Sequence, residues 1–254
     1  MLPAGGCRLS VQAAGSRRLR REDPTLRGLL VRSRDPAGGR PVSEAVSERS
    51  RPEPALWQRL KTATADHHRR IEERFGILDP GLTRADYRFW LERLYGFYAP
   101  LESALEPWAG PMAIDWQARR KTAWLRADLA HLGHDPDAIA GLPVCTALPA
   151  VGDLAAAFGV AYVLEGATLG GRIIARRLRG RLGVDAAGGA AFFTAYGDDV
   201  DVRWAAFRQR LAAAVAPLDA ERRTIAAACE TFDTLGAWLA AGRVSTRHGQ
   251  VPAP

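Results

Sequence analysis

The chain has 254 residues, of which 47% are hydrophobic, so it can bury at least one core and is not a wholly disordered protein. Its formal net charge of +7 is uneven, because residues 1–54 hold 11 Arg against 6 Asp or Glu. The other 24 basic and 22 acidic residues give only +2. The basic character belongs largely to the N-terminal segment and gives little support to nucleic-acid binding by the folded part.

The cysteines and the hydropathy pattern narrow the class of protein further. Cys7, Cys145 and Cys229 are widely spaced and form no CxxC pair, which argues against a disulfide framework or a zinc site. We expect Cys145 and Cys229 to be small buried side chains in a reducing, cytoplasmic setting. No run of about 18 apolar residues is present, so we expect no transmembrane helix. The N-terminus also lacks the apolar core of a secretory signal.

The first third of the chain holds a leader and two predicted helices. Residues 1–54 are rich in Gly, Pro, Ser and Arg, and we predict a disordered leader or an upstream extension from a misplaced start. Pro54 is well placed to open a helix over about 55–75. Thr83 and Asp86 match a capping box, which predicts a second helix up to about residue 105.

The remaining elements are also predicted to be helical. We expect helices over about 114–131 (ending at Gly133), 151–178, 189–214 with an irregularity at Gly197, and from Pro217 to about 240. Residues 133–149 are expected to form a loop and residues 241–254 a loose tail. No alternating strand pattern or repeat is present. The sequence therefore predicts one all-α domain, a multi-helix bundle over residues 55–240.

The stretch LKTATADHHRRIEE (residues 60–73) is the first candidate site. Lys61, Thr64, His68 and Glu72 are spaced 3, 4 and 4, so they share one face of the first helix. Lys61 and His68 lie about 10 Å apart along the axis at roughly 1.5 Å per residue. That is about the distance from the centre of a porphyrin to its propionates, so such a row can hold an iron and an edge carboxylate. The alternative is a solvated charged face.

The neighbouring histidine competes for the same role. The apolar stripe of this helix runs through Leu56, Leu60, Ala63, His67, Ile71 and Phe75. By that periodicity His67, and not His68, lies on the seam with the core.

A glycine-rich helix is the second candidate site. Residues 162–177 read YVLEGATLGGRIIARR, and each interior glycine costs a helix up to about 1 kcal/mol relative to Ala. Gly166 and Gly170 are four residues apart and bare the backbone of one face. Such spacing is typical of two closely packed helices, but it also suits a flat ligand lying against the backbone.

These segments together resemble the biliverdin-producing heme oxygenases, most closely the bacterial ones associated with bacteriophytochromes. The family's proximal element, L-K/R-x-x-T-x-x-x-H-x-x-x-E, is matched by residues 60–72, and its glycine-rich distal helix by LEGATLGG at 164–171. RRKTAWLRADLAHLG (119–133), LPVCTALP (142–149) and FFTAYGDDVDVRWAAF (192–207) are similar to family segments in the same order. The resemblance covers residues 55–240.

The resemblance implies a role for each residue of the two sites. His68 becomes the proximal iron ligand, because Thr64 and Glu72 both keep the family spacing to it, and His67 would break both spacings. Glu72 would orient the imidazole. Lys61 matches a position that pairs with a heme propionate. Arg208 falls near another such position, although Arg203 is close enough in sequence to serve instead.

The same resemblance implies the chemistry. Heme would be both cofactor and substrate, and dioxygen with electrons from a ferredoxin or reductase would open it to biliverdin, carbon monoxide and ferrous iron. A bacteriophytochrome is the expected biliverdin acceptor. Gly166 and Gly170 would crowd the oxygen toward one meso carbon. Mammalian-type members carry an aspartate where this chain has Ala167, so either another group, with Thr168 as a candidate, organises the distal water or the water network differs.

Two other classes of protein remain open from the residues. A heme-binding or sensing protein without turnover would also keep His68. Thiaminase-like and carboxylate di-iron enzymes share the helical architecture, but they need a cysteine nucleophile or several inward ligands. Glu72, Glu92, Glu165 and His131 are available for such a cluster, although no ExxH pair occurs.

Overall fold

The computed structural model describes residues 55–247, with side chains placed as far as residue 242. The predicted leader, residues 1–54, and residues 248–254 of the predicted tail lie outside this range. Within it the chain forms α1 (Leu56–Arg74), α2 (Arg84–Leu105), α3 (Ala109–Met112), α4 (Thr122–His131), α5 (Pro136–Ala140), α6 (Leu154–Leu182), α7 (Val200–Ala214) and α8 (Leu218–Arg247). No β-strand forms among the described residues. The predicted all-α bundle is confirmed.

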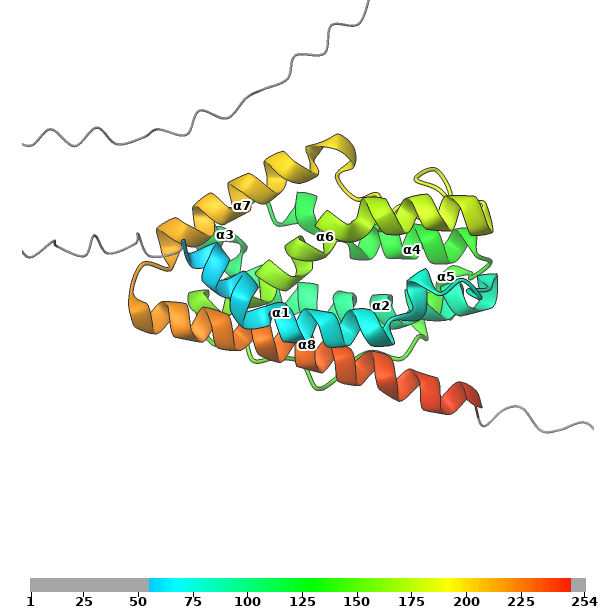
Figure 1. Cartoon of the computed structure of the whole chain (residues 1–254), viewed down its shortest axis with the longest axis horizontal. Helices are drawn as coiled ribbons and strands as arrows, with labels where there is room; N and C mark the ends of the chain where they lie inside the picture. The colour runs from blue at the N-terminus through cyan, green and yellow to red at the C-terminus, as the bar shows by residue number, and fades with distance from the viewer. Residues whose placement is uncertain (1–54, 248–254) are drawn as a thin grey trace, which may run out of the picture. The chain divides into compact units, whose positions relative to one another are not determined.

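The long helix α8 is the platform on which the bundle is built. Both α6 and α1 pack along it, α7 packs on α6, and α2 packs on α4 (Figure 1). By contrast α1 and α6 contact each other only sparsely, and they diverge along their length in Figure 1. In this arrangement α1 and α6 lie on the same side of α8 and face each other across a gap.

Local capping residues fix the start of α2 and both ends of α6. The Thr83 hydroxyl accepts the Asp86 backbone N–H at 3.1 Å, and the Asp86 carboxylate accepts the Thr83 N–H at 2.9 Å, so the predicted capping box is confirmed. Asp153 accepts the Ala156 N–H at 2.8 Å at the start of α6. Gly183, with φ +68°, ends α6 in the left-handed conformation that glycine tolerates best.

The predicted third helix is wrong in its first half. Instead of one helix over 114–131, the chain turns at Ala113 (φ 51°), makes a short 3₁₀ turn, and enters α4 only at Thr122. The cause is the buried carboxylate of Glu102, which accepts the backbone N–H groups of Lys121 and Thr122. This cap comes from a different helix, about twenty residues earlier in the sequence, so local patterns could not reveal it.

The predicted fifth helix and the tail also differ from the structure. Residues 191–196 form turns and Gly197–Asp199 a short 3₁₀ helix, and α7 begins only at Val200. The Asp128 carboxylate accepts the N–H groups of Ala191 and Phe192 at 2.8 and 2.9 Å, which holds the turns in place. In the C-terminal region, α8 continues through Gly242 to Arg247, where a loose tail was expected.

The helix α6 is long and apolar enough to cross a membrane by length and composition alone, contrary to the expectation from the sequence. Two-thirds of the apolar stretch, 67%, is buried within the bundle. Its apolar composition is therefore used in packing against α7 and α8.

Candidate functional site

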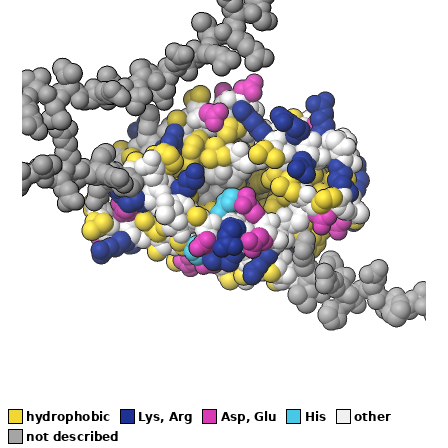
Figure 2. Space-filling view, in the orientation of Figure 1, with side chains coloured by type: hydrophobic (Ala, Val, Ile, Leu, Met, Phe, Trp, Pro, Cys, Tyr) yellow, Lys and Arg dark blue, Asp and Glu magenta, His cyan; other side chains and the backbone are white. Residues whose placement is uncertain are grey.

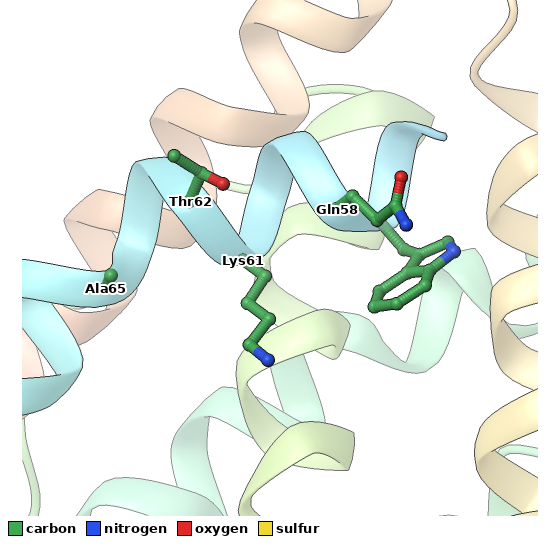
Figure 3. Close-up of a pocket in the computed structure, with 5 residues that line it drawn as sticks. Gln58, Lys61, Thr62 and Ala65 are labelled. Carbon is green, nitrogen blue, oxygen red and sulfur yellow. The ribbon is translucent and has the colours of Figure 1, made fainter. Parts of the chain in front are cut away.

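One face of α1 is open. Trp57, Lys61, Ala65, His68 and Glu72 recur at helical spacing on this face, while the opposite side buries its apolar residues in the core. The first two turns border a pocket of about 580 Å³, a volume within the range of small-molecule sites. Its lining residues are Trp57, Gln58, Lys61, Thr62 and Ala65, and the Lys61 side chain extends from α1 toward the helices opposite (Figure 3).

The two adjacent histidines point to different surroundings. Nδ1 of His67 lies 2.7 Å from a carboxylate oxygen of Asp233 on α8, so His67 belongs to the packing seam as the apolar stripe predicts. The His68 side chain is 56% exposed on the open face. Its Nδ1 lies 3.4 Å from a carboxylate oxygen of Glu72, and its ring meets the edge of Phe232 at 5.8 Å. His68 is therefore available to a ligand, with Nε2 as its outward nitrogen.

The glycines of α6 divide into packed and open positions. A Cβ on Gly159 would collide with the Thr224 carbonyl oxygen on α8, and one on Gly171 with the Phe193 carbonyl oxygen. By contrast a Cβ on Gly166 would meet only Trp204, at 4.0 Å, and one on Gly170 would meet nothing within 4 Å. Close packing against α8 thus explains Gly159, and close packing against the turn at Phe193 explains Gly171, but neither explains Gly166 and Gly170. Their backbone borders open space.

The open faces of α1 and α6 border a hollow, which we call the slot. Its α1 wall carries Lys61, Ala65, His68 and Glu72, and its α6 wall carries Gly166, Leu169, Gly170 and Ile173. Figure 2 shows this side of the molecule hollowed between the two helices, with hydrophobic side chains along the walls and a histidine at the rim. Leu169 and Ile173 are 43% and 64% exposed, and because they lie one helical turn apart they give this wall a small continuous apolar surface.

Thr64 and Thr168 are buried behind these walls. The Thr64 hydroxyl donates to the Leu60 carbonyl at 2.8 Å, near the side chain of Tyr162 on α6. The Thr168 hydroxyl donates to the Glu165 carbonyl at 2.7 Å, on the side of α6 away from Gly166 and Gly170. The structure therefore does not bring either threonine onto the open faces. Ala167, next to Gly166, is exposed.

Arg208 of α7 reaches the Lys61 end of the slot. Its guanidinium carbon lies 4.8 Å from the centre of the Trp57 ring, and Trp57 also lines the pocket beside Lys61. The Nε atom of Arg208 is buried and has no hydrogen-bond partner among the described residues. An orphaned guanidinium N–H beside an ammonium is suited to an anionic group such as a propionate.

Arg203, the alternative to Arg208, is already engaged elsewhere. It donates to the Ala118 carbonyl at 3.2 Å, and its guanidinium lies over the Tyr196 ring at 4.7 Å. Of the two arginines, Arg208 is the one with an unfilled donor at the slot.

A buried ionic cluster that the sequence did not reveal lies directly behind the open glycines. The Glu165 carboxylate accepts hydrogen bonds from Lys121 Nζ at 2.6 Å, from the Tyr196 hydroxyl at 2.8 Å, and from Arg119. Burial alone would raise the pKa of Glu165, but Lys121 and Arg119 outweigh that effect and lower the pKa. The carboxylate is held ionised one residue before Gly166. The only signal in the sequence was a charged residue inside an apolar helix.

Comparison with known proteins identifies the family. A family model described as heme oxygenase matches residues 54–241, nearly all of the described part of the chain. The chain belongs to the heme oxygenase family. A protein of Xanthomonas campestris pv. campestris (strain 8004) described as heme oxygenase is 35% identical over 135 residues, which make up 51% of this chain and 76% of that protein. The predicted family is confirmed, and its members are heme-degrading oxidoreductases.

Solved structures of heme oxygenases share the fold. The heme oxygenase of Neisseria meningitidis, in NO- and CO-bound crystal structures, aligns with a TM-score of 0.64 at 20% identity over 74% of this chain and 92% of that one. The enzyme of Leptospira interrogans aligns at 0.62 and 16% over 74% and 100%. Heme oxygenase-1 of Synechocystis sp. PCC6803, in complex with heme, aligns at 0.63 and 16% over 77% and 96%.

The residues available to a di-iron or thiaminase-like site do not converge. Within the described residues, no three His, Cys, Asp or Glu side chains come together. Glu92 contacts His134 at 3.0 Å, whereas Glu165 lies in the ionic cluster. Burial raises the pKa of both Cys145 and Cys229, which is the opposite of what a nucleophilic thiol requires.

Proposed function

We propose that this protein cleaves heme oxidatively to biliverdin, carbon monoxide and ferrous iron in the slot between α1 and α6. The observation that carries the proposal is the combination of an exposed imidazole, His68, on one wall with a backbone left bare at Gly166 and Gly170 on the other. The exposed Leu169 and Ile173 supply apolar surface for a porphyrin. The fit is chemical as well as steric, because Arg208 offers an unpartnered donor to a carboxylate.

The proximal wall would hold the iron and the propionates. His68 would bind the iron through Nε2, because its Nδ1 faces the Glu72 carboxylate, which would orient the ring and strengthen the imidazole as a ligand. Lys61 and Arg208 would bind the propionates at the other end of the slot. Thr64 would contribute indirectly, since it is buried behind this wall with its hydroxyl bound to the Leu60 carbonyl.

The distal wall would direct the reaction. Bound heme supplies the iron at which dioxygen is activated and is itself the molecule that is oxidised. Because Gly166 and Gly170 carry no side chain, they would allow a flat ligand to lie against the α6 backbone, and this wall would limit the directions from which dioxygen could approach it. Because Ala167 carries no acid and the Thr168 hydroxyl is bonded to Glu165, we assign proton delivery to water held by backbone groups near Gly166.

The partners follow from the chemistry. Oxidative ring opening consumes electrons, so an electron donor such as a ferredoxin or a reductase is required. A bacteriophytochrome is the proposed acceptor of the biliverdin, and the cytoplasm is the proposed location.

The proposal is tested by turnover with product analysis. The purified full-length chain is mixed with hemin, which should produce a Soret band, and ascorbate or a reductase system is then added in air. We expect the heme spectrum to be replaced by biliverdin absorption. Ala167 is the observation that favours the alternative, a heme-binding protein without turnover, and a heme spectrum that persists under these conditions would establish that alternative.

A further inference from the structure

One end of the slot is closed by aromatic side chains. Tyr162 lies one helical turn before Gly166 on the same face of α6, and its ring centre is 5.6 Å from that of Trp204 on α7. Trp204 in turn stacks on Phe207 at 5.7 Å with only 18° between the ring planes. The tip of the Trp204 indole is also the nearest atom to a Cβ placed on Gly166. The two rings therefore stand beside the first open glycine.

The wall is anchored on both sides of the slot. The Tyr162 side chain lies near Thr64, which is one turn before His68 on α1 and whose hydroxyl donates to the Leu60 carbonyl. Tyr162 is buried at this point, one turn before the bare backbone of Gly166. Burial raises the pKa of Tyr162, so the phenol remains neutral. Phe207 is fully buried, which fixes the ring on which Trp204 rests.

This geometry has a consequence for any planar ligand held by His68. A single axial bond fixes the centre of a planar ring but leaves it free to rotate about that bond. The orientation within the plane must come from contacts at the ring edge. Lys61 and Arg208 supply polar contacts at the rim, and the wall of Tyr162 and Trp204 supplies a rigid apolar stop.

We propose that Trp204 and Tyr162 are positioning residues that determine which meso bridge of the heme is cut. The inference rests on the proposed function and adds its regiochemistry. Trp204 is the main contributor, because its indole stands over Gly166 and only part of it is buried. The Tyr162 ring supports the indole from behind.

The test compares products and heme orientation in matched variants of the full-length chain. Trp204→Leu removes the indole from the wall, and Trp238→Leu makes the same change between α8 and α2, where the indole N–H donates to the Arg93 carbonyl. Biliverdin isomers are separated by chromatography. Proton NMR of the ferric cyanide complex reports the heme methyl shifts, and this measurement needs no turnover.

We expect Trp204→Leu to raise the share of minor isomers roughly three- to tenfold, the range that corresponds to the loss of one aromatic contact. It should also give a second set of methyl resonances. Trp238→Leu, which keeps both rings of the wall, should retain the wild-type pattern. If Trp204→Leu fails to fold, Trp204→Phe shortens the ring and should give a smaller shift in the same direction.

The outcomes separate this inference from the proposed function. An unchanged isomer ratio and unchanged methyl shifts in Trp204→Leu overturn the inference and leave the activity intact. A wild-type protein that binds hemin without making biliverdin refutes the activity, and the methyl shifts then still decide the role of the wall. A wild-type protein that binds no hemin refutes both.

Discussion

Nδ1 of His67 lies 2.7 Å from a carboxylate oxygen of Asp233, a contact that joins the first helix to the last. It separates the two adjacent histidines by role, since His68 faces the slot. We predict that His68→Ala abolishes or strongly alters the Soret band of the hemin complex. His67→Ala should leave the band in place and lower the free energy of unfolding by no more than about 1 kcal/mol, because the pair is partly exposed. Loss of the band in His67→Ala alone would mean that the ligand has been assigned to the wrong histidine.

Four of the five glycines of α6, Gly159, Gly166, Gly170 and Gly171, give opposite predictions for stability and for turnover. Replacing Gly166 or Gly170 by Ala meets no obstacle, so the ligand-free protein should gain up to about 1 kcal/mol in helix propensity, or roughly 2–4 °C in Tm. Biliverdin formation should fall in the same variants, because the new methyl group occupies the slot. Calorimetry and the turnover assay measure the two effects on one sample.

Gly159→Ala and Gly171→Ala are the matched controls for that experiment. Their new methyl groups collide with backbone carbonyl oxygens, so we expect a loss of roughly 1–3 kcal/mol of stability. If Gly166→Ala proves as destabilising as Gly159→Ala, then Gly166 is a packing residue and the slot is narrower than described.

Lys61 and Arg208 should act on the ligand through its charge. Lys61→Ala and Arg208→Ala are each expected to weaken hemin binding about five- to tenfold, the usual effect of losing a charge-assisted contact. Titration with the dimethyl ester of hemin is the control, since that molecule carries no propionate charge. The variants and the wild type should bind the ester equally, and a difference that persists with the ester would show that these side chains act sterically.

Substitutions in the ionic cluster behind Gly166 should have strongly non-additive effects on stability. Glu165→Gln leaves Lys121 and Arg119 buried without their carboxylate, and we expect a loss of about 3–5 kcal/mol in the free energy of unfolding. Glu165→Leu combined with Lys121→Met should cost less than the sum of the single changes, because Lys121 is no longer left as an unpaired buried charge and only Arg119 loses its carboxylate. Denaturant titrations of the full cycle measure the coupling. Additive effects would indicate that water, and not the partner side chain, satisfies each group.

Asp128 should make stability depend on pH. Burial raises its pKa to about 6, against the lowering effect of the N–H groups of Phe192 and Ala191. An acid with a raised pKa binds a proton more tightly in the folded state than in the unfolded state. The resulting stabilisation is complete below about pH 4 and is lost as the pH rises to about 6, a change of roughly 2–3 kcal/mol.

The comparison with Asp128→Asn isolates this effect. The free energy of unfolding of the wild type minus that of the variant should fall between about pH 4 and pH 6 and remain level above that range. A difference that rises with pH would mean that the two backbone donors dominate and that the carboxylate is stabilised as an anion.

The sequence predicted the parts of the fold that depend on local chemistry. Thr83 and Asp86 signal a helix start within four residues, and the 3–4–4 spacing of Lys61, Thr64, His68 and Glu72 assigns them to neighbouring positions on α1. The family followed from several such segments in order. What local patterns missed depends on distant partners: Glu102 caps α4 from another helix, and Lys121 meets Glu165 across 44 residues of sequence.

The glycines show the same division within one helix. Spacing identified Gly166 and Gly170 as special but did not distinguish a packed face from an open one. That distinction depends on what lies opposite each position, Thr224 of α8 for Gly159 and nothing within 4 Å for Gly170. Thr168 illustrates the converse, since it stands next to the open positions in sequence but faces into the bundle.

Because α1 and α6 both rest on α8 and barely contact each other, the width of the slot is inherited from a helix that lines little of it. Side chains on α8, such as Ala227 beneath Gly159 and Thr224, whose hydroxyl donates to the Ala155 carbonyl, act as spacers for the α6 wall. Larger or smaller side chains at these positions would change the distance between α1 and α6, while every residue on the facing walls stayed the same. Natural variation in ligand fit within such a fold can therefore arise outside the binding surface.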